Sequence, residues 1–156
     1  MNEQDLDYSK GTISISLVHE ALLNAQQQGL DIQNILMKSG IPDELMHSSK
    51  ARVSVSQYAQ LWTELADAMN DEFFGMDSHP MRRGSFKLLS QLVMQAETLE
   101  KALQHILQFL NLLLDDFVSQ LFVQENYAYI VIYEQKQTKR MFSYATYLML
   151  IHGLMC

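Results

Sequence analysis

The sequence predicts an α+β fold that is mostly α-helical, with helices packed around a small antiparallel β-hairpin near residues 117–133. Apolar residues recur at helical spacing over most of the chain, whereas residues 117–133 are rich in β-branched and aromatic side chains on either side of a polar turn. The composition, 48% hydrophobic and 19% charged over 156 residues, is typical of one globular domain.

The helical segments are bounded by capping and stop signals. Gly29 and Gly40 are expected helix stops, and Pro42 suits the first turn of a short helix. Ser54 and Gln57 match an S-x-x-Q capping box. Helices are therefore expected over residues 13–28, 31–40, 43–47, 54–69, 85–94, 98–113 and 142–155.

The hairpin is expected from strands 117–123 and 127–133, with Glu125–Asn126 as the turn between them. Tyrosines and a valine share one face of the second strand, and alanine and isoleucines share the other. Because both faces are apolar, we expect this sheet to be covered on both sides.

Charge and cysteine content limit the partners and the compartment. The net charge of −7 argues against a grip on nucleic-acid phosphates, and the single Cys156 fits a reducing cytoplasm. The polar start has no signal-peptide pattern, and no apolar run is long enough for a membrane span. We expect a flexible tail over residues 1–11, a cytoplasmic location and no membrane contact.

No constellation for catalysis or metal binding is present. The five histidines are scattered without H-E-x-x-H spacing, and neither a G-x-S-x-G elbow nor a glycine-rich phosphate loop occurs. Two acidic pairs, Asp71–Glu72 and Asp115–Asp116, lie at predicted helix ends and are interpreted as solvated charges. The sequence therefore predicts that the chain is not an enzyme and has no cofactor and no metal.

Residues 31–47 have the outline of a helix-turn-helix, with two short helices around a glycine. A helix that recognises bases should present Arg, Lys, Asn or Gln, but the second helix offers Asp43, Glu44 and Met46. Direct DNA binding by this segment is not expected. The ten methionines, seven phenylalanines and seven tyrosines fit either an ordinary core or a pocket for an apolar ligand.

Several sequence marks occur in a characteristic order over about residues 12–133. They are an LD-x-x-x-IL-x-x-x-GI pattern from Leu30 to Ile41, Arg52–Val53, the helix of Trp62, Asp71 to Gly75, Pro80–Met81 with Gly84 to Phe86, and "TLEKAL" from Thr98 to Leu103. Together they resemble the N-terminal domain, named arabinose-binding, of AraC-type bacterial transcription regulators. That domain is distinct from the cupin barrel of the arabinose regulator itself and occurs in regulators unrelated to arabinose.

The resemblance implies a regulatory, effector-sensing domain over residues 12–156. Related regulators sense fatty acids, amino acids or other small metabolites, and contact DNA through a C-terminal pair of helix-turn-helix motifs. Since that region is absent here and the chain ends on the apolar stretch 153–156, we expect a truncated regulatory domain. DNA binding would need the missing C-terminal domain.

Two sets of residues are candidates for contacts. An anionic effector would favour Arg82 and Arg83 beside Ser85, because a loop that enters a helix N-terminus also offers free N–H groups. The candidate pocket walls are Phe86, His105, Phe109, Tyr129 and Tyr133. The alternatives are ordinary surface charges for the arginines and core packing for the others.

A second class of function is also open, a dimerisation module of the regulator without a ligand. Leucines lie on several sides of the 98–113 helix, more than one core face buries. A homodimer contact is therefore expected through Leu107, Leu110, Leu112 and Leu114.

Overall fold

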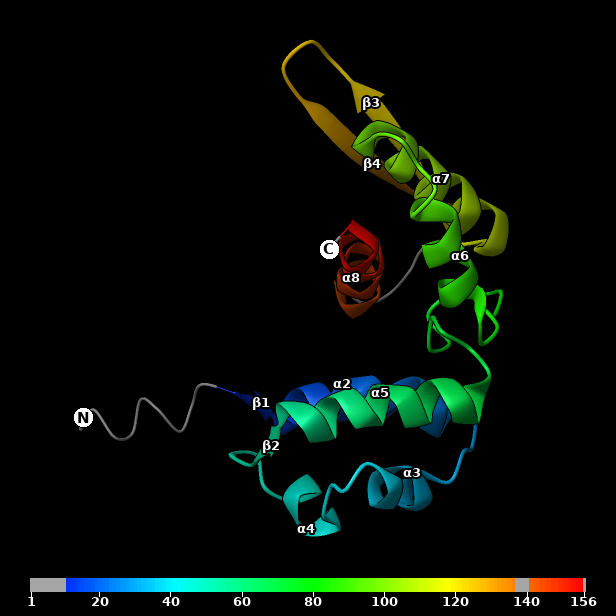
Figure 1. Cartoon of the computed structure of the whole chain (residues 1–156). Coiled ribbons are helices and arrows are strands. Elements are labelled where there is room, and N and C mark those ends of the chain that lie inside the picture. The colour runs from blue at the N-terminus through cyan, green and yellow to red at the C-terminus, as the bar shows by residue number, and fades with distance from the viewer. Residues whose placement is uncertain (1–10, 137–140, 156) are drawn as a thin grey trace, which may run out of the picture. The chain divides into compact units, whose positions relative to one another are not determined.

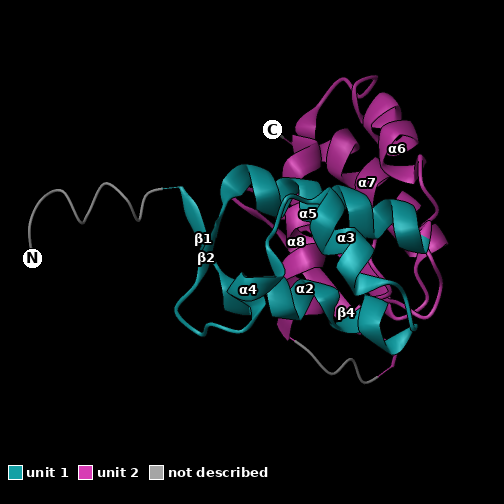
Figure 2. Cartoon of the chain, turned by 90° about the horizontal axis from the view of Figure 1, so that it is seen from below, with its two compact units in different colours: residues 1–69 teal, residues 70–156 magenta. Residues whose placement is uncertain are grey.

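The computed structural model describes residues 11–136 and 141–155. Of these residues 55% are helical, and they contain two small two-stranded antiparallel sheets, which confirms the predicted α+β class. Two compact units, Met1–Met69 and Asn70–Cys156, divide the chain (Figure 2). The assignment of 12–156 to one domain stays a prediction. The predicted tail, apart from Gly11, and Cys156 lie outside the described residues.

Unit 1 consists of short strands and helices in a regular succession (Figure 1). They are β1 (Thr12–Ser14), α2 (Ile15–Gln27), α3 (Ile32–Lys38), α4 (Asp43–Met46), β2 (Arg52–Ser54) and α5 (Val55–Met69). Helices α2 and α5 lie side by side and α3 packs against α5. Gly29, just after α2, has a φ of +72°, the left-handed conformation expected of a glycine at a helix stop.

The β1–β2 pair is an element that the sequence did not predict, because a three-residue strand is too short to show alternation. Each strand runs directly into a helix through a serine. Ser14 Oγ accepts a hydrogen bond from the Ser16 N–H at 3.3 Å. Ser54 and Gln57 form the predicted capping box, in which Ser54 Oγ accepts from the Gln57 N–H and Gln57 Oε1 accepts from the Ser54 N–H.

The segment weighed as a helix-turn-helix contains only one helix of more than one turn. Helix α4 is four residues long, and its Asp43 carboxylate accepts a hydrogen bond from Gln33 of α3 at 2.9 Å. This bond lowers the pKa of Asp43 and favours a negative charge on α4. A single acidic turn has neither the length nor the side chains of a recognition helix.

Unit 2 contains a helical pair, the hairpin and a final helix. They are α6 (Ser85–Val93), α7 (Leu99–Leu113), β3 (Phe117–Val123), β4 (Ala128–Glu134) and α8 (Met141–Met155) (Figure 1). Helix α7 contacts α6, β3 and α8, so it is the central helix of the unit. All five elements agree within one residue at each end with the expected ranges.

An aromatic cluster forms the core of unit 2. Phe73, Phe117 and Tyr147 are fully buried, and the rings of Phe117 and Tyr147 stack with 5.2 Å between centroids. Phe73 meets both rings edge-on. Burial raises the pKa of Tyr147, whose hydroxyl forms a hydrogen bond with the Ser119 hydroxyl. This bond connects α8 to β3 beside the aromatic cluster.

The hairpin pairs β3 and β4 in unbroken register from Phe117 opposite Glu134 to Val123 opposite Ala128. The predicted turn is present at residues 125–126, where the Gln124 N–H donates to the carbonyl of Tyr127 at 2.8 Å. The expectation that both faces are covered is wrong. One face carries exposed aromatic side chains because no described element of unit 2 packs over it: Phe122, Tyr127, Tyr129 and Tyr133.

Three of the four leucines expected at a dimer contact are buried within the protein. Leu107, Leu110 and Leu114 are at most 3% exposed, whereas Leu112 is 82% exposed. The several leucine-bearing sides of α7 have intramolecular partners because the helix packs against α6, β3 and α8. The prediction that these leucines exceed what the core can bury is therefore wrong for Leu107, Leu110 and Leu114. Of the four, only Leu112 is available for an external contact.

Helix α8 is buried on one side only. The buried side holds Ser143, Thr146, Tyr147 and Ile151. The other side exposes Met141, Leu148, Met149 and Met155. No helix among the described residues is long and apolar enough to cross a membrane.

The burial of the α7 leucines predicts unequal effects of two identical truncations. Leu110→Ala should lower the free energy of unfolding by about 2–5 kcal/mol, since it leaves a cavity in the core. Leu112→Ala, two residues away, should change it by no more than about 0.5 kcal/mol. Urea unfolding followed by circular dichroism measures both, and equal losses would contradict this account of α7.

Candidate functional site

Carboxylates organise the segment 70–84 that leads into α6. Asp71 is buried, and its Oδ1 accepts hydrogen bonds from the N–H groups of Phe73 and Met81, each at 2.8 Å. Its Oδ2 accepts from the Gly75 N–H at 2.6 Å. Phe74, inside this turn, has a φ of +58°, which costs a non-glycine residue roughly 1–2 kcal/mol. The three hydrogen bonds to Asp71 hold the backbone in this strained turn and place Phe73 in the core.

The side-chain carboxylate of Glu72 lies at the N-terminus of α6. Its Oε1 accepts from the Gly84 N–H at 2.9 Å and from the Arg83 guanidinium at 3.1 Å, and its Oε2 accepts from the Phe86 N–H at 2.6 Å. Free N–H groups at a helix start together with an arginine make an anion site. In this protein the anion is the internal carboxylate of Glu72, only 8% exposed.

Two further carboxylates connect the same segment to the start of β3. Asp77 accepts hydrogen bonds from the N–H groups of Asp115 and Asp116 at 2.8 and 2.7 Å. Asp116 in turn accepts from the N–H and the hydroxyl of Ser78 and lies 3.3 Å from Lys136 Nζ. Burial alone would raise the pKa of Asp116, but the hydrogen bonds from Ser78 and Lys136 together outweigh it and lower that pKa.

The interpretation of the two acidic pairs as solvated helix-end charges is therefore wrong for Asp71, Glu72 and Asp116, which are buried. Only Asp115 is exposed. Sequence patterns could not reveal these roles, because several of the N–H partners lie 10 to 38 residues away along the chain. Within the described ranges, no group of three or more His, Cys, Asp or Glu side chains could hold a metal.

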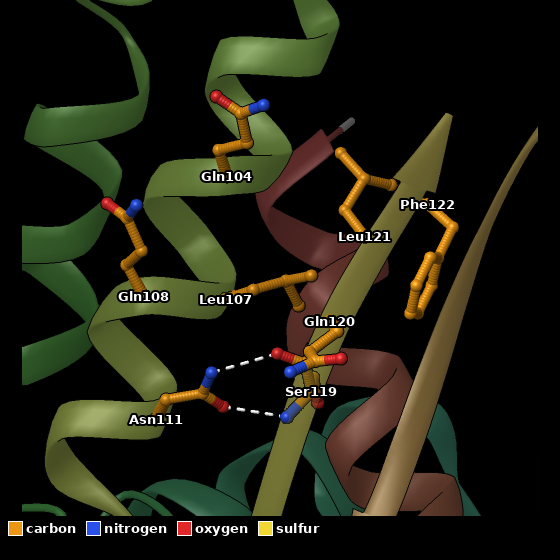
Figure 3. A pocket seen from close by; sticks show the side chains of 8 residues that line it. All are labelled: Gln104, Leu107, Gln108, Asn111, Ser119, Gln120, Leu121 and Phe122. Carbon is orange, nitrogen blue, oxygen red and sulfur yellow. Dashed lines mark hydrogen bonds between the residues drawn. The ribbon is translucent and has the colours of Figure 1, made fainter. Parts of the chain in front are cut away.

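An open groove of about 310 Å³ lies between α7 and β3 (Figure 3). Its apolar lining comes from Leu107 of α7 and from Leu121 and Phe122 of β3. Its polar lining is uncharged and consists of Gln104, Gln108 and Asn111 of α7 with Ser119 and Gln120 of β3. The groove thus offers amide donors and acceptors beside an apolar wall, without a charged side chain.

Asn111 fixes the two walls of this groove to each other. Its Nδ2 donates to the Ser119 carbonyl, and its Oδ1 accepts from the Ser119 N–H, each at 2.8 Å (Figure 3). A side-chain amide thereby pairs with the outer edge of β3 as a neighbouring strand would.

A second depression, of about 460 Å³, lies beside the start of α6. It is lined by Arg83, Gly84, Ser85, Lys87, Leu88 and Gln91. Its two cations distinguish it from the α7–β3 groove, although Arg83 already pairs with Glu72.

The structure separates the candidate effector residues instead of gathering them. Arg83 and Ser85 line the α6 depression. Tyr129 and Tyr133 lie on the exposed face of the hairpin. None of the eight candidates is among the residues that line the α7–β3 groove.

The other candidates lie at the start of α6 and on α7. Phe86, His105 and Phe109 are partly buried there, while Arg82 is exposed. The Nδ1 atom of His105 is buried and has no hydrogen-bond partner in the described part of the chain. The assignment of all eight residues to an effector stays a prediction.

Comparison with known families decides the classification. The family model for the arabinose-binding domain of AraC transcription regulators, N-terminal, matches residues 29–156, more than half of the chain. The chain belongs to this family. The resemblance drawn from the sequence marks is thereby confirmed, and the arabinose-binding-type domain is a regulatory and non-enzymatic one, as expected. No curated protein and no solved structure matched the chain.

The capping role of Glu72 predicts a large effect from one truncation in this arabinose-binding-type domain. Glu72→Ala should lower the free energy of unfolding by about 1–3 kcal/mol, because two N–H groups at the start of α6 lose their acceptor. Glu97→Ala is the matched control, since Glu97 is exposed and pairs with Lys101 on the surface, and should cost about 0.5 kcal/mol or less. Similar losses in chemical denaturation would rule out the cap.

The lowered pKa of Asp116 predicts a loss of stability in acid. The contribution of this carboxylate is present above its ordinary pKa of 3.8 and disappears as the pH falls through the lower folded-state pKa. The wild type should therefore be more stable than Asp116→Asn at pH 7, by a margin that shrinks below about pH 4. Thermal unfolding between pH 3 and 7 measures this, with Asp115→Asn, at the exposed neighbour, as control. A margin that does not depend on pH would refute it.

Proposed function

We propose that this domain senses a small metabolite in the α7–β3 groove and thereby controls transcription by the cytoplasmic regulator to which it belongs. The observation that carries the proposal is the lining of the groove, in which amide side chains surround an apolar wall. Its volume of about 310 Å³ falls at the lower end of the range of small-molecule sites.

The lining favours a ligand whose bound part is uncharged. Amides both donate and accept, so hydroxyl, amide and carbonyl groups find partners on Gln104, Gln108 and Gln120. Leu121 and Phe122 suit an apolar portion of the same molecule. The carboxylate of a fatty acid or an amino acid would meet no cation in this groove, and would favour the α6 depression with its Lys87.

The groove has one wall from α7 and one from β3, so a bound ligand could change how these two elements are arranged. A bound molecule changes an equilibrium only by binding one arrangement more tightly than another. A ligand that spans α7 and β3 would stabilise the arrangement in which Asn111 clamps the two together. DNA contact would then respond through the C-terminal region expected of such regulators.

The alternative proposal is a dimerisation module without a small-molecule ligand. The exposed methionines and Leu148 on α8 favour it, because an apolar helix side in water is typical of a contact surface. The two proposals differ in their response to small molecules.

Thermal shift against a panel of neutral metabolites, amino acids and fatty acids tests effector sensing. A ligand that binds the folded state raises the melting temperature by mass action. We expect neutral, hydrogen-bonding compounds to give the shift, and Gln108→Ala to weaken their binding by roughly 3- to 10-fold, the effect of one hydrogen bond.

Gln91→Ala serves as the matched control, because Gln91 lines the α6 depression instead. It should leave the shift unchanged. A shift that is lost in Gln91→Ala but kept in Gln108→Ala would move the site to α6. No shift with any compound would favour the dimerisation module.

A further inference from the structure

Ser119 is the residue at which the α7–β3 groove meets the core of unit 2. It lines the groove, yet it is only 2% exposed. Its N–H and carbonyl bond the Asn111 amide of α7, each at 2.8 Å, and its hydroxyl forms a hydrogen bond with the Tyr147 hydroxyl of α8. The backbone N–H, the carbonyl and the hydroxyl are the polar groups of a serine. All three are therefore engaged, two by α7 and one by α8.

The backbone and the side chain of Ser119 point in different directions, so one residue makes both contacts. In a strand the N–H and the carbonyl lie in the plane of the sheet, whereas the side chain stands roughly perpendicular to it. The backbone groups of Ser119 reach the Asn111 amide on α7 (Figure 3), and the hydroxyl reaches Tyr147 on α8. A shift of β3 against α7 therefore also moves the hydroxyl to which Tyr147 is bonded.

Tyr147 attaches α8 to β3 at the aromatic cluster. Its ring stacks on Phe117, and it meets Phe73 edge-on with 6.3 Å between ring centroids. Phe117 and Ser119 are two residues apart in β3, so their side chains lie on the same face of the strand. The ring and the hydroxyl of Tyr147 thus contact neighbouring positions of one strand face, and α8 is sensitive to where that face lies.

The bond between the Ser119 and Tyr147 hydroxyls is costly to lose. Both residues are buried, and a buried hydroxyl that loses its partner bears the cost of its desolvation without compensation. The bond therefore favours the position of β3 in which Ser119 is also bonded to Asn111. A displacement of β3 that breaks the contact with α7 weakens the attachment of α8 as well.

We propose that Ser119 couples the α7–β3 groove to α8, so that a molecule bound in the groove holds α8 more firmly on the aromatic cluster. The coupling rests on the proposed function for the molecule that fills the groove, and it adds the element that responds. Because coupling between two sites is reciprocal, a firmly held α8 also strengthens binding in the groove. Leu148 and Met149, which follow Tyr147, are 53% and 71% exposed, so a change in α8 reaches the surface.

A double-mutant cycle in urea unfolding tests the coupling without any added molecule. Asn111→Ala and Tyr147→Phe each remove one partner of Ser119, and each should raise the equilibrium constant of unfolding by about fivefold or more. Because both act through Ser119, the double variant should fall short of the product of the two effects by about threefold or more. Gln108→Ala with Tyr147→Phe is the matched control, since Gln108 lines the same groove without a bond to Ser119. Its two effects should multiply to within about twofold.

Hydrogen exchange shows whether α8 responds to a filled groove. In a Cys156→Ser background, Gln108→Cys labelled with N-ethylmaleimide places a small uncharged group in the groove. The label should slow amide exchange in α8 by about threefold or more relative to the unlabelled variant, and by more than it slows exchange in α6. Gln91→Cys carries the same label into the α6 depression as the control, and should leave exchange in α8 unchanged.

Two results would overturn the coupling, and neither depends on an effector. One is a cycle in which Asn111→Ala and Tyr147→Phe multiply as fully as the control pair. The other is exchange in α8 that the label at position 108 does not slow. A coupling that holds while no metabolite raises the melting temperature would count against effector sensing alone. A metabolite that binds in the groove without slowing exchange in α8 would count against the coupling alone.

Discussion

Backbone N–H groups need acceptors, and in residues 71–86 side-chain carboxylates accept hydrogen bonds from seven of them. Asp71, Glu72, Asp77 and Asp116 replace the hydrogen-bond ladder that a helix or sheet would supply. The aromatic core depends on this arrangement because Asp71 positions Phe73. The start of α6 depends on it through Glu72, and the start of β3 through Asp77. Unit 2 is therefore organised by carboxylates, three of which, Asp71, Glu72 and Asp116, are buried.

Local signals predicted the elements well, and tertiary relations account for the failures. The Ser54–Gln57 capping box and the stop at Gly29 need only neighbouring residues, so the sequence displays them directly. Whether Leu107 or Leu112 faces solvent depends on which helices and strands surround α7, and no periodicity contains that information. Ser78, which donates hydrogen bonds to Asp116, lies 38 residues away along the chain. The sequence alone therefore presents Asp115–Asp116 as solvated charges at a helix end.

The candidate site shows the same difference between local signals, which the sequence displays, and tertiary contacts, which it does not. The sequence predicts basic and aromatic contact residues, because such residues bind anions and apolar ligands. The polar side of the α7–β3 groove is instead lined mainly by glutamines and Asn111, which neither charge nor periodicity singles out. Of the residues that line the groove, Leu107 alone is a predicted contact residue, and the prediction places it at a dimer interface. The helix start that is predicted to bind an anion does hold one, the carboxylate of Glu72. The internal pairing of Glu72 with Arg83 and with the N–H groups at the start of α6 thus accounts for the predicted anion site.

The contact between Asn111 and Ser119 restricts what evolution can place at position 111. The side chain must offer a donor and an acceptor at once, at the reach of a single methylene. Aspartate has the shape but no hydrogen to give, leucine has neither function, and glutamine is one carbon too long for the same geometry. Neighbouring groove residues such as Gln104 and Gln108 carry no such bond to the strand. The polar lining of the groove can therefore change at its glutamines, while the asparagine that joins its walls has no equivalent substitute.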